Sequence, residues 1–136
     1  MKKHTIRCPY CGSPALLKDA SFVYGAHARG EKLYVCLHYP ACNSYVGVHT
    51  GTTIPKGTLA NQSLRKKRIL AHQVFDQIWK HGIMTKQDAY RWIADKFSLD
   101  TTQAHIGYFN DYMCNRLIEE ASKVLVYNHI PMSAAR

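Results

Sequence analysis

Long apolar segments are missing from this chain of 136 residues, and no run approaches the ~18 residues that a membrane-spanning helix needs. The segment of the first seven residues carries positive charge, but no apolar segment follows it, so we expect no signal peptide. We also find no internal repeat and no low-complexity tract. These absences favour a cytoplasmic protein with reduced thiols, built as one ordinary domain or two very small ones.

Catalytic motifs are missing as well. The chain has no P-loop, no G-x-S-x-G and no H-E-x-x-H motif. His105 with Asp111 or Cys114 is a conceivable catalytic pair, but a hydrogen-bonded helix histidine is the simpler interpretation. We therefore expect a binding protein rather than an enzyme.

Acidic residues are scarce, with nine Asp and Glu against 18 Lys and Arg, and the resulting net charge of +9 is unevenly placed. Residues 1–52 hold six basic and two acidic residues, residues 53–82 hold six and one, and residues 83–136 hold six and six. A basic part beside a neutral part indicates a surface that faces a polyanion. The alternative is a charge that serves only solubility.

Cysteine is also infrequent, but four of the five cysteines form two closely spaced pairs. The first pair is separated by two residues and the second by five, and Pro and Gly accompany them as turn formers. This spacing is typical of a tetrahedral zinc site with bonds of about 2.3 Å. Two disulfides or four buried thiols are the alternatives, and a non-secreted chain favours metal. We predict one structural Zn²⁺ at Cys8, Cys11, Cys36 and Cys42.

Two histidines and the fifth cysteine raise the question of further ligands. His38 and His49 lie close to the second cysteine pair in the sequence, but each is more simply a surface side chain. Cys114 lies far away in a stretch with helical character. A site of four thiolates leaves no open coordination position, so we expect the metal to be structural rather than catalytic.

The segment around the cysteine pairs predicts a small antiparallel sheet. Apolar and alternating runs predict short strands at residues 15–18, 21–24, 32–36 and 44–49. Two cysteine turns joined by a hairpin, with a strand after them, predict a zinc ribbon over residues 1–54. So small a sheet buries little surface, so metal binding would supply much of its folding free energy.

Residues 55–136 predict a three-helix segment, and the fold class is therefore α+β. Apolar residues at helical spacing predict helices over 61–81, 85–97 and 100–124. Gly82 is a plausible stop for the first, and Thr85 and Asp100 are plausible caps for the next two. The sequence leaves open whether the ribbon and the helices share one core.

Aromatic and basic residues are interleaved in the ribbon, and four cations follow one another in the first predicted helix, where they oppose its dipole. Exposed rings stack on unpaired bases at ~1–3 kcal/mol each, while cations contact the phosphates. The alternatives are that the rings form the core of the ribbon and that the cations form a solvated helix face. We predict a site for nucleic acid, single-stranded DNA first, that comprises Lys18, Tyr24, Arg29, Lys32, Tyr34, Tyr39, Arg65, Lys66, Lys67 and Arg68.

The cysteine turns resemble the zinc ribbons at the C-terminus of bacterial type IA topoisomerases. Residues 8–12 share the C-P-x-C-G opening, and residues 36–42 share the C-x5-C pair with proline two positions before the last cysteine. The resemblance implies zinc at all four cysteines and binding of single-stranded DNA partly through exposed aromatic residues. It covers about a quarter of the chain and implies no topoisomerase activity, because the catalytic tyrosine domain is absent.

Over its full length, the chain resembles a small family of zinc-finger-containing proteins common in bacteriophage and prophage genomes. The resemblance rests on residues 55–60, 71–76, 89–92 and 104–107. It implies the fold and the length but no activity. A phage-type interaction module that binds and modulates a host protein, such as an enzyme, is therefore the alternative to nucleic-acid binding.

Overall fold

The computed structural model describes residues 6–28 and 30–130, so Arg29 of the predicted nucleic-acid site lies outside the described residues. The chain divides into two compact units, Met1–Ser63 and Leu64–Arg136. The described residues combine a small antiparallel sheet with four α-helices, which confirms the predicted α+β class.

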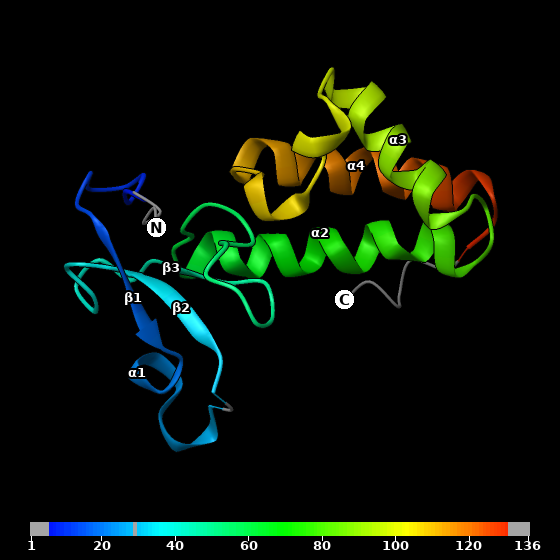
Figure 1. Ribbon diagram of the computed structural model, residues 1–136. Helices are drawn as coiled ribbons and strands as arrows, with labels where there is room; N and C mark the ends of the chain where they lie inside the picture. Colours follow the sequence, from blue (N-terminus) through cyan, green and yellow to red (C-terminus); the bar gives the residue numbers. More distant parts are fainter. Residues whose placement is uncertain (1–5, 29, 131–136) are drawn as a thin grey trace. The chain divides into compact units, whose positions relative to one another are not determined.

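The first unit contains a three-stranded antiparallel sheet with the order β1-β2-β3 (Figure 1). Its elements are β1 (Ala15–Asp19), α1 (Ser21–Tyr24), the 3-10 turn η1 (Gly25–His27), β2 (Lys32–Cys36) and β3 (Tyr45–Gly47). In the register, Leu17 pairs with Tyr34 and Tyr34 pairs with Val46, so β2 is the central strand. Because side chains alternate along a strand, Leu33 and Val35 face one side of the sheet and Tyr34 and Cys36 the other.

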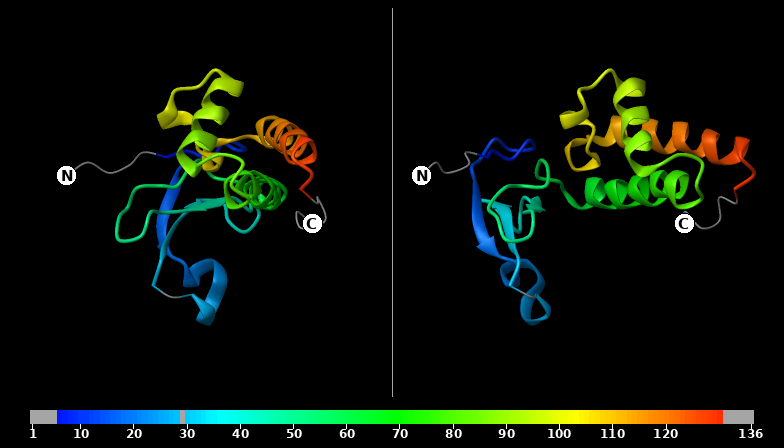
Figure 2. Two further views of the ribbon diagram at one scale, coloured as in Figure 1. Left: turned by 90° about the vertical axis from the view of Figure 1, so that its right-hand side faces the viewer. Right: turned by 45° about the vertical axis from the view of Figure 1, so that its right-hand side comes forward.

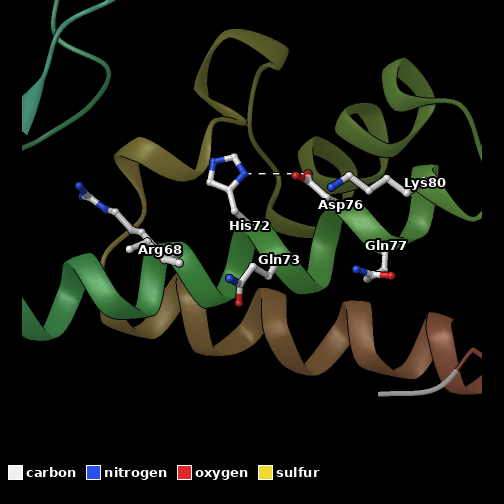
Figure 3. Close-up of a pocket in the computed structure, with 7 residues that line it drawn as sticks. Arg68, His72, Gln73, Asp76, Gln77 and Lys80 are labelled. Carbon is white, nitrogen blue, oxygen red and sulfur yellow. Dashed lines mark ion pairs between the residues drawn. The ribbon is translucent and has the colours of Figure 1, made fainter. Parts of the chain in front are cut away.

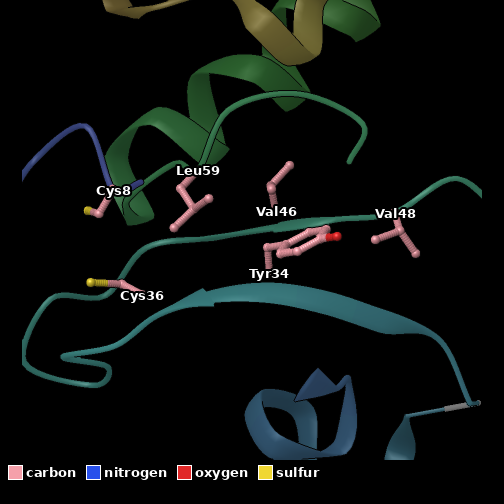
Figure 4. Packing of buried hydrophobic residues seen from close by; sticks show 6 residues of the cluster. All are labelled: Cys8, Tyr34, Cys36, Val46, Val48 and Leu59. Atoms are coloured by element: carbon pink, nitrogen blue, oxygen red, sulfur yellow. The ribbon is translucent and has the colours of Figure 1, made fainter. Parts of the chain in front are cut away.

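Both faces of β2 are covered. On one face Leu33, Val35 and Ala20 form a small buried cluster. On the other face a second cluster contains Cys8, Tyr34, Cys36, Val46, Val48 and Leu59 (Figure 4). The sheet therefore carries a separate apolar cluster on each side, and the cysteines belong to only one of them.

Leu59 reaches the second cluster because residues 55–60 return to the sheet. Val48 pairs with Pro55, and Tyr45 pairs with Ala60, both in antiparallel bridges. Leu59 is fully buried as a result. The first unit therefore extends to Ser63, beyond the boundary between residues 54 and 55 that the turn-rich sequence suggested.

The prediction of a strand over residues 21–24 is wrong, because this segment forms α1. The backbone N–H groups of Val23 and Tyr24 both donate to the carbonyl oxygen of Ala20, at 3.0 and 2.8 Å, which closes a helical turn. Gly25 follows with φ of +69°, a conformation that suits glycine. The β-branched and aromatic residues therefore turn the chain between β1 and β2 instead of extending the sheet.

The second unit contains most of α2 (Gln62–Lys80), together with α3 (Lys86–Phe97) and α4 (Asp111–Tyr127). Figures 1 and 2 show α2 and α4 side by side with α3 crossing them. The predicted apolar stripe of the first helix is confirmed, since its five members are all buried: Leu64, Ala71, Val74, Phe75 and Ile78. No helix within the described residues is both long enough and apolar enough to cross a membrane.

The predicted cap of α3 is present, with the Thr85 hydroxyl accepting from the backbone N–H of Asp88 at 3.0 Å. The start of the third predicted helix is wrong. Asp100 and Gln103 do form a capping box, but it opens only the 3-10 turn η2 (Thr101–Gln103). A second 3-10 turn, η3 (Ile106–Tyr108), follows, and α4 begins only after Asn110 caps it by accepting from Met113.

Candidate metal centre

The first cysteine turn is closed by its own backbone. The N–H of Gly12 donates to the carbonyl oxygen of Cys8 at 2.9 Å, and the N–H of Cys8 donates to that of Ser13 at 2.8 Å. Gly12 has φ of +75°, which favours glycine over any side chain. The turn brings Cys11 back beside Cys8, as the C-P-x-C-G pattern predicts.

The second cysteine turn is wider and begins at the end of β2. The N–H of Tyr39 donates to the carbonyl oxygen of Cys36 at 2.9 Å, and the N–H of Cys42 donates to that of His38 at 3.0 Å. The N–H of Ser44 then donates to the carbonyl oxygen of Cys42 at 2.9 Å as the chain enters β3. These bonds place both cysteines of the turn at the same end of the sheet.

The structure brings all four predicted cysteines together, with their sulfur atoms within 4.8 Å of one another. The Sγ atoms of Cys8 and Cys42 are 3.5 Å apart, as are those of Cys11 and Cys36. A tetrahedron with bonds of about 2.3 Å has edges of about 3.8 Å, so the sulfur positions fit a bound zinc ion. All five cysteines are free, so the two-disulfide alternative, which needs sulfurs at about 2.05 Å, does not apply.

Hydrogen bonds prepare two of the thiols to ionise. His38 and Ser13 lower the pKa of Cys11 to about 5. Burial acts to raise the pKa of Cys8, but hydrogen bonds from the Ser44 hydroxyl and from the backbone of Tyr10 outweigh it and lower that pKa. The backbone bond from Tyr10 to Cys8 Sγ is 3.4 Å long.

The other two thiols resist ionisation. Burial is the main cause that raises the pKa of Cys36, and burial raises the pKa of Cys42 to about 12. Four thiolates this close together need a compensating cation, and a metal ion keeps its coordinating thiols deprotonated. The donor set and its hydrogen bonds therefore suit a divalent, thiolate-binding ion such as Zn²⁺.

Neither nearby histidine is part of the metal cluster. His38 Nδ1 lies 2.9 Å from the Ser13 hydroxyl and 4.0 Å from Cys11 Sγ. His38 therefore contacts the predicted metal ligand Cys11 without belonging to the four-cysteine set. His49 is exposed. Cys114 is buried in the second unit, where burial raises its pKa to about 11.

Ser44 is a residue of this site that sequence reasoning missed. Its side chain is fully buried, and its hydroxyl lies 3.1 Å from Cys8 Sγ and 3.7 Å from Cys42 Sγ. The signal in the sequence was its position, two residues after Cys42, where a small hydroxyl can turn back toward the sulfurs.

The predicted aromatic residues do not share one environment. Tyr34 is only 4% exposed, and its hydroxyl donates to the backbone oxygen of Thr53 at 2.6 Å. The expectation that Tyr34 is available for stacking is therefore wrong, because it belongs to the buried cluster next to the cysteines. Tyr24 is 51% exposed, and Tyr39 is partly buried against the opposite cluster.

The predicted cations of the ribbon also differ from one another. Lys32 Nζ lies 2.8 Å from Asp19 Oδ1, and this pair lowers the pKa of Asp19. Lys18 Nζ lies 5.2 Å from the centroid of the Phe22 ring, within the range of a cation–π contact. Of the two predicted ribbon cations that the structure describes, Lys18 is therefore the one in contact with an aromatic ring.

The four consecutive cations of α2 are partly used by the fold of the second unit. Arg68 is 9% exposed, and its Nε donates to the carbonyl oxygen of Phe109 at 3.0 Å. Lys67 Nζ lies 3.3 Å from Asp111 Oδ1 at the start of α4. Arg65 is partly buried, and Lys66 is exposed. The cluster therefore offers less charge to a ligand than its sequence suggests.

Comparison with known proteins supports the metal centre. The family model of a zinc-finger-containing domain, DUF3268, matches residues 4–124. No curated protein and no solved structure matches the chain. Because the matched segment includes all four clustered cysteines and most of the chain, this protein belongs to the DUF3268 family of zinc-finger-containing domains, with a four-cysteine site for one zinc ion.

Proposed function

We propose that this protein binds single-stranded nucleic acid, with single-stranded DNA as the first candidate, through an aromatic surface on its ribbon. This surface comprises Lys18, Phe22, Tyr24, Tyr39 and Tyr45. It lies on the face of the sheet opposite the cluster that contains the cysteines. The metal would then stabilise the sheet that carries the surface, without contacting the ligand.

The observation that carries the proposal is a continuous row of four rings. Phe22 and Tyr39 have centroids 5.8 Å apart, Tyr39 and Tyr45 are 6.1 Å apart, and Tyr45 and Tyr24 are 5.9 Å apart. The two end members, Phe22 and Tyr24, are each 51% exposed. The two middle rings pack on Leu33 and Val35, so they support the outer rings from the sheet.

Exposed rings of this kind suit unpaired bases. Stacking contributes ~1–3 kcal/mol per base and depends little on sequence, because every base has a flat face. Lys18 contacts the Phe22 ring, so its ammonium group is close enough to meet the phosphate of a base that stacks there. The resemblance of the cysteine turns to topoisomerase ribbons supports DNA as the first nucleic acid to test.

The experiment is fluorescence anisotropy of the zinc-loaded chain with single-stranded and double-stranded DNA of equal length over a salt series. We expect binding to the single strand, with Phe22→Ala and Tyr24→Ala each weakening it about tenfold. Tyr112→Ala is the matched control, because Tyr112 is an exposed tyrosine of α4 that is 69% exposed. A loss of affinity equal in Tyr24→Ala and Tyr112→Ala would contradict the aromatic surface.

The same measurement separates nucleic acid from a protein partner. A chain with net charge +9 and a working phosphate site should bind DNA at ~50 mM salt. Absence of binding there would overturn the proposal and favour the alternative of a host protein bound to the same aromatic residues. A complex with a host protein that survives nuclease and high salt would then be the expected finding.

A further inference from the structure

The second unit carries a surface that the proposed function does not use. An open groove of about 370 Å³ runs along the exposed side of α2, and its lining includes Ile69, His72, Gln73, Asp76, Gln77 and Lys80 (Figure 3). All of these residues belong to one helix, so the groove follows the helix axis. An extended partner can therefore contact this side of α2 along the helix axis.

Four of the lining residues form a narrow stripe on α2, which Lys66 extends toward the start of the helix. At 3.6 residues per turn, positions 66, 69, 73, 77 and 80 fall within about 80° of one another around the helix. In chain order the stripe is Lys66, Ile69, Gln73, Gln77 and Lys80. Two cations therefore flank two carboxamides and one apolar side chain, and Ile69 is 59% exposed.

The stripe has the chemistry of a helix that contacts base edges. A glutamine carboxamide can donate to and accept from adenine at the same time, and an apolar side chain can contact the methyl group of thymine. Gln73 is exposed, while the Gln77 side-chain oxygen lies 2.8 Å from His81 Nε2. His81 thereby fixes the orientation of the second carboxamide.

The charge and the length of the stripe also match a DNA duplex. Lys66 and Lys80 are 14 residues apart, or about 21 Å along the axis. This distance exceeds the width of the major groove, about 12 Å, so each lysine can meet a different phosphate strand. The acid in the groove, Asp76, accepts a hydrogen bond from Trp79 Nε1 at 3.1 Å, which reduces its repulsion of phosphates. Burial lowers the pKa of His72, so this histidine, 4.0 Å from Asp76, adds no positive charge at neutral pH.

We propose that α2 binds the major groove of double-stranded DNA, with Gln73 at an A·T pair and Lys66 and Lys80 on the flanking phosphates. This site is additional to the single-strand surface of the ribbon. It involves another unit of the chain, another form of DNA and other side chains, so the two proposals can fail independently.

The test measures binding of the full zinc-loaded chain to an A·T-rich and a G·C-rich duplex of equal length by fluorescence anisotropy. Gln73→Ala should weaken binding to the A·T-rich duplex about tenfold and leave the G·C-rich duplex unaffected. Gln87→Ala, at an exposed glutamine of α3, is the matched control. Equal effects of the two substitutions on the A·T-rich duplex would overturn base contact by α2.

The salt dependence of binding tests the proposed phosphate contacts of Lys66 and Lys80. Lys66→Ala and Lys80→Ala should each reduce the slope of log affinity against log salt by about one, for both duplexes. Lys123→Ala removes the same charge from the exposed side of α4, where Lys123 is paired with Glu120, and should leave the slope unchanged. A slope that falls equally in all three variants would overturn the proposed phosphate contacts.

Two further measurements distinguish major-groove binding by α2 from duplex binding through the ribbon or through charge alone. An RNA duplex should bind more weakly than the DNA duplex, because the major groove of A-form RNA is too narrow for a helix; equal binding would overturn the proposal. Tyr24→Ala should weaken single-strand binding and leave duplex binding intact. Weaker binding of Gln73→Ala to the A·T-rich duplex, with normal single-strand binding, would support α2 whether or not the ribbon surface binds single strands.

Discussion

The hydroxyl oxygen of Ser44 lies 3.1 Å from the sulfur of Cys8 in the metal centre, and both side chains are buried. A hydroxyl that donates to a thiolate stabilises the charged form, and Ser44 is among the causes that lower the pKa of Cys8. Ser44 would therefore influence a bound metal ion indirectly, by stabilising the thiolate of the ligand Cys8.

Replacement of Ser44 by alanine should weaken zinc binding. Loss of a hydrogen bond to a ligand typically lowers metal affinity 10–100-fold, so we expect a decrease of about tenfold. The fold should persist, because the backbone bonds of Ser44 to Cys36 and Cys42 do not involve its side chain. Competition with a chromophoric chelator measures the affinity, and unchanged competition by Ser44→Ala would contradict the role of the hydroxyl.

Removal of the metal should unfold the first unit and spare the helices of the second. Cys8 and Cys36 are both part of the buried cluster, so the thiolates hold the apolar side chains of the sheet in place. Chelation, or Cys11→Ser, should therefore remove the near-UV signal of the ribbon tyrosines while most of the far-UV helical signal remains. Loss of both signals in a single step would show that the helices also need the metal.

Arg68 should matter for stability, unlike its neighbour Lys66. Its guanidinium Nε donates to the backbone oxygen of Phe109, and removal of such a charged donor costs about 1.5–3 kcal/mol. Urea denaturation of Arg68→Ala should show a loss of about 2 kcal/mol in the free energy of unfolding. Lys66→Ala, at an exposed position of the same helix, should change it by less than about 0.5 kcal/mol. Equal stability of the two variants would contradict a structural role for Arg68.

Glu120 should make the helical unit sensitive to acid. The hydrogen bond from Lys96, supported by Lys123, lowers the pKa of Glu120 below its usual range. The folded state therefore gains stability from Glu120 at neutral pH, and this gain is lost as the pH falls through the lowered pKa.

The variant Glu120→Gln tests this pH dependence. It should be less stable than the wild-type chain at pH 7. The difference should shrink as the pH falls below about 4.3, where the carboxylate of the unfolded state becomes protonated, and it should vanish once the pH is below the lowered pKa of the folded state. Glu119→Gln is the control, because the ion pair of Glu119 with Arg116 is long, at 4.0 Å, and the Glu119 side chain is 60% exposed. Thermal unfolding over a pH series measures both, and a constant difference at all pH values would contradict the expectation.

Features that depend on local spacing could be predicted from the sequence. The two cysteine turns, the strands around Leu17 and Tyr34, and the buried stripe of α2 all follow from neighbours a few residues apart. The short helix at Ser21–Tyr24 could not be predicted, because Phe22, Val23 and Tyr24 individually favour strands. The ladder of β1 with β2 ends at the pair of Asp19 and Lys32, and the N–H of Ala20 adds one further bond of 2.8 Å to the carbonyl oxygen of Glu31 before the helix begins.

Features that depend on tertiary contacts could not be predicted in this way. Asp100 has a proper cap, but the chain turns again after η2, since Ala104 and Ile106 are both buried. Tyr34 and Tyr24 have the same chemistry, and only their positions in the ribbon decide which is buried. Arg68 continues a run of cations, and its interior role depends on a carbonyl group 41 residues later.

The return of residues 55–60 to the sheet limits how the zinc-binding part can be separated from the rest. A fragment that ends at residue 54 would lose Leu59 from the cluster around Tyr34 and both backbone bridges to β3 and its extension. It would expose apolar surface beside an unpaired strand edge, which promotes aggregation. A portable form of this zinc finger therefore has to include the residues up to Ser63, where the first unit ends.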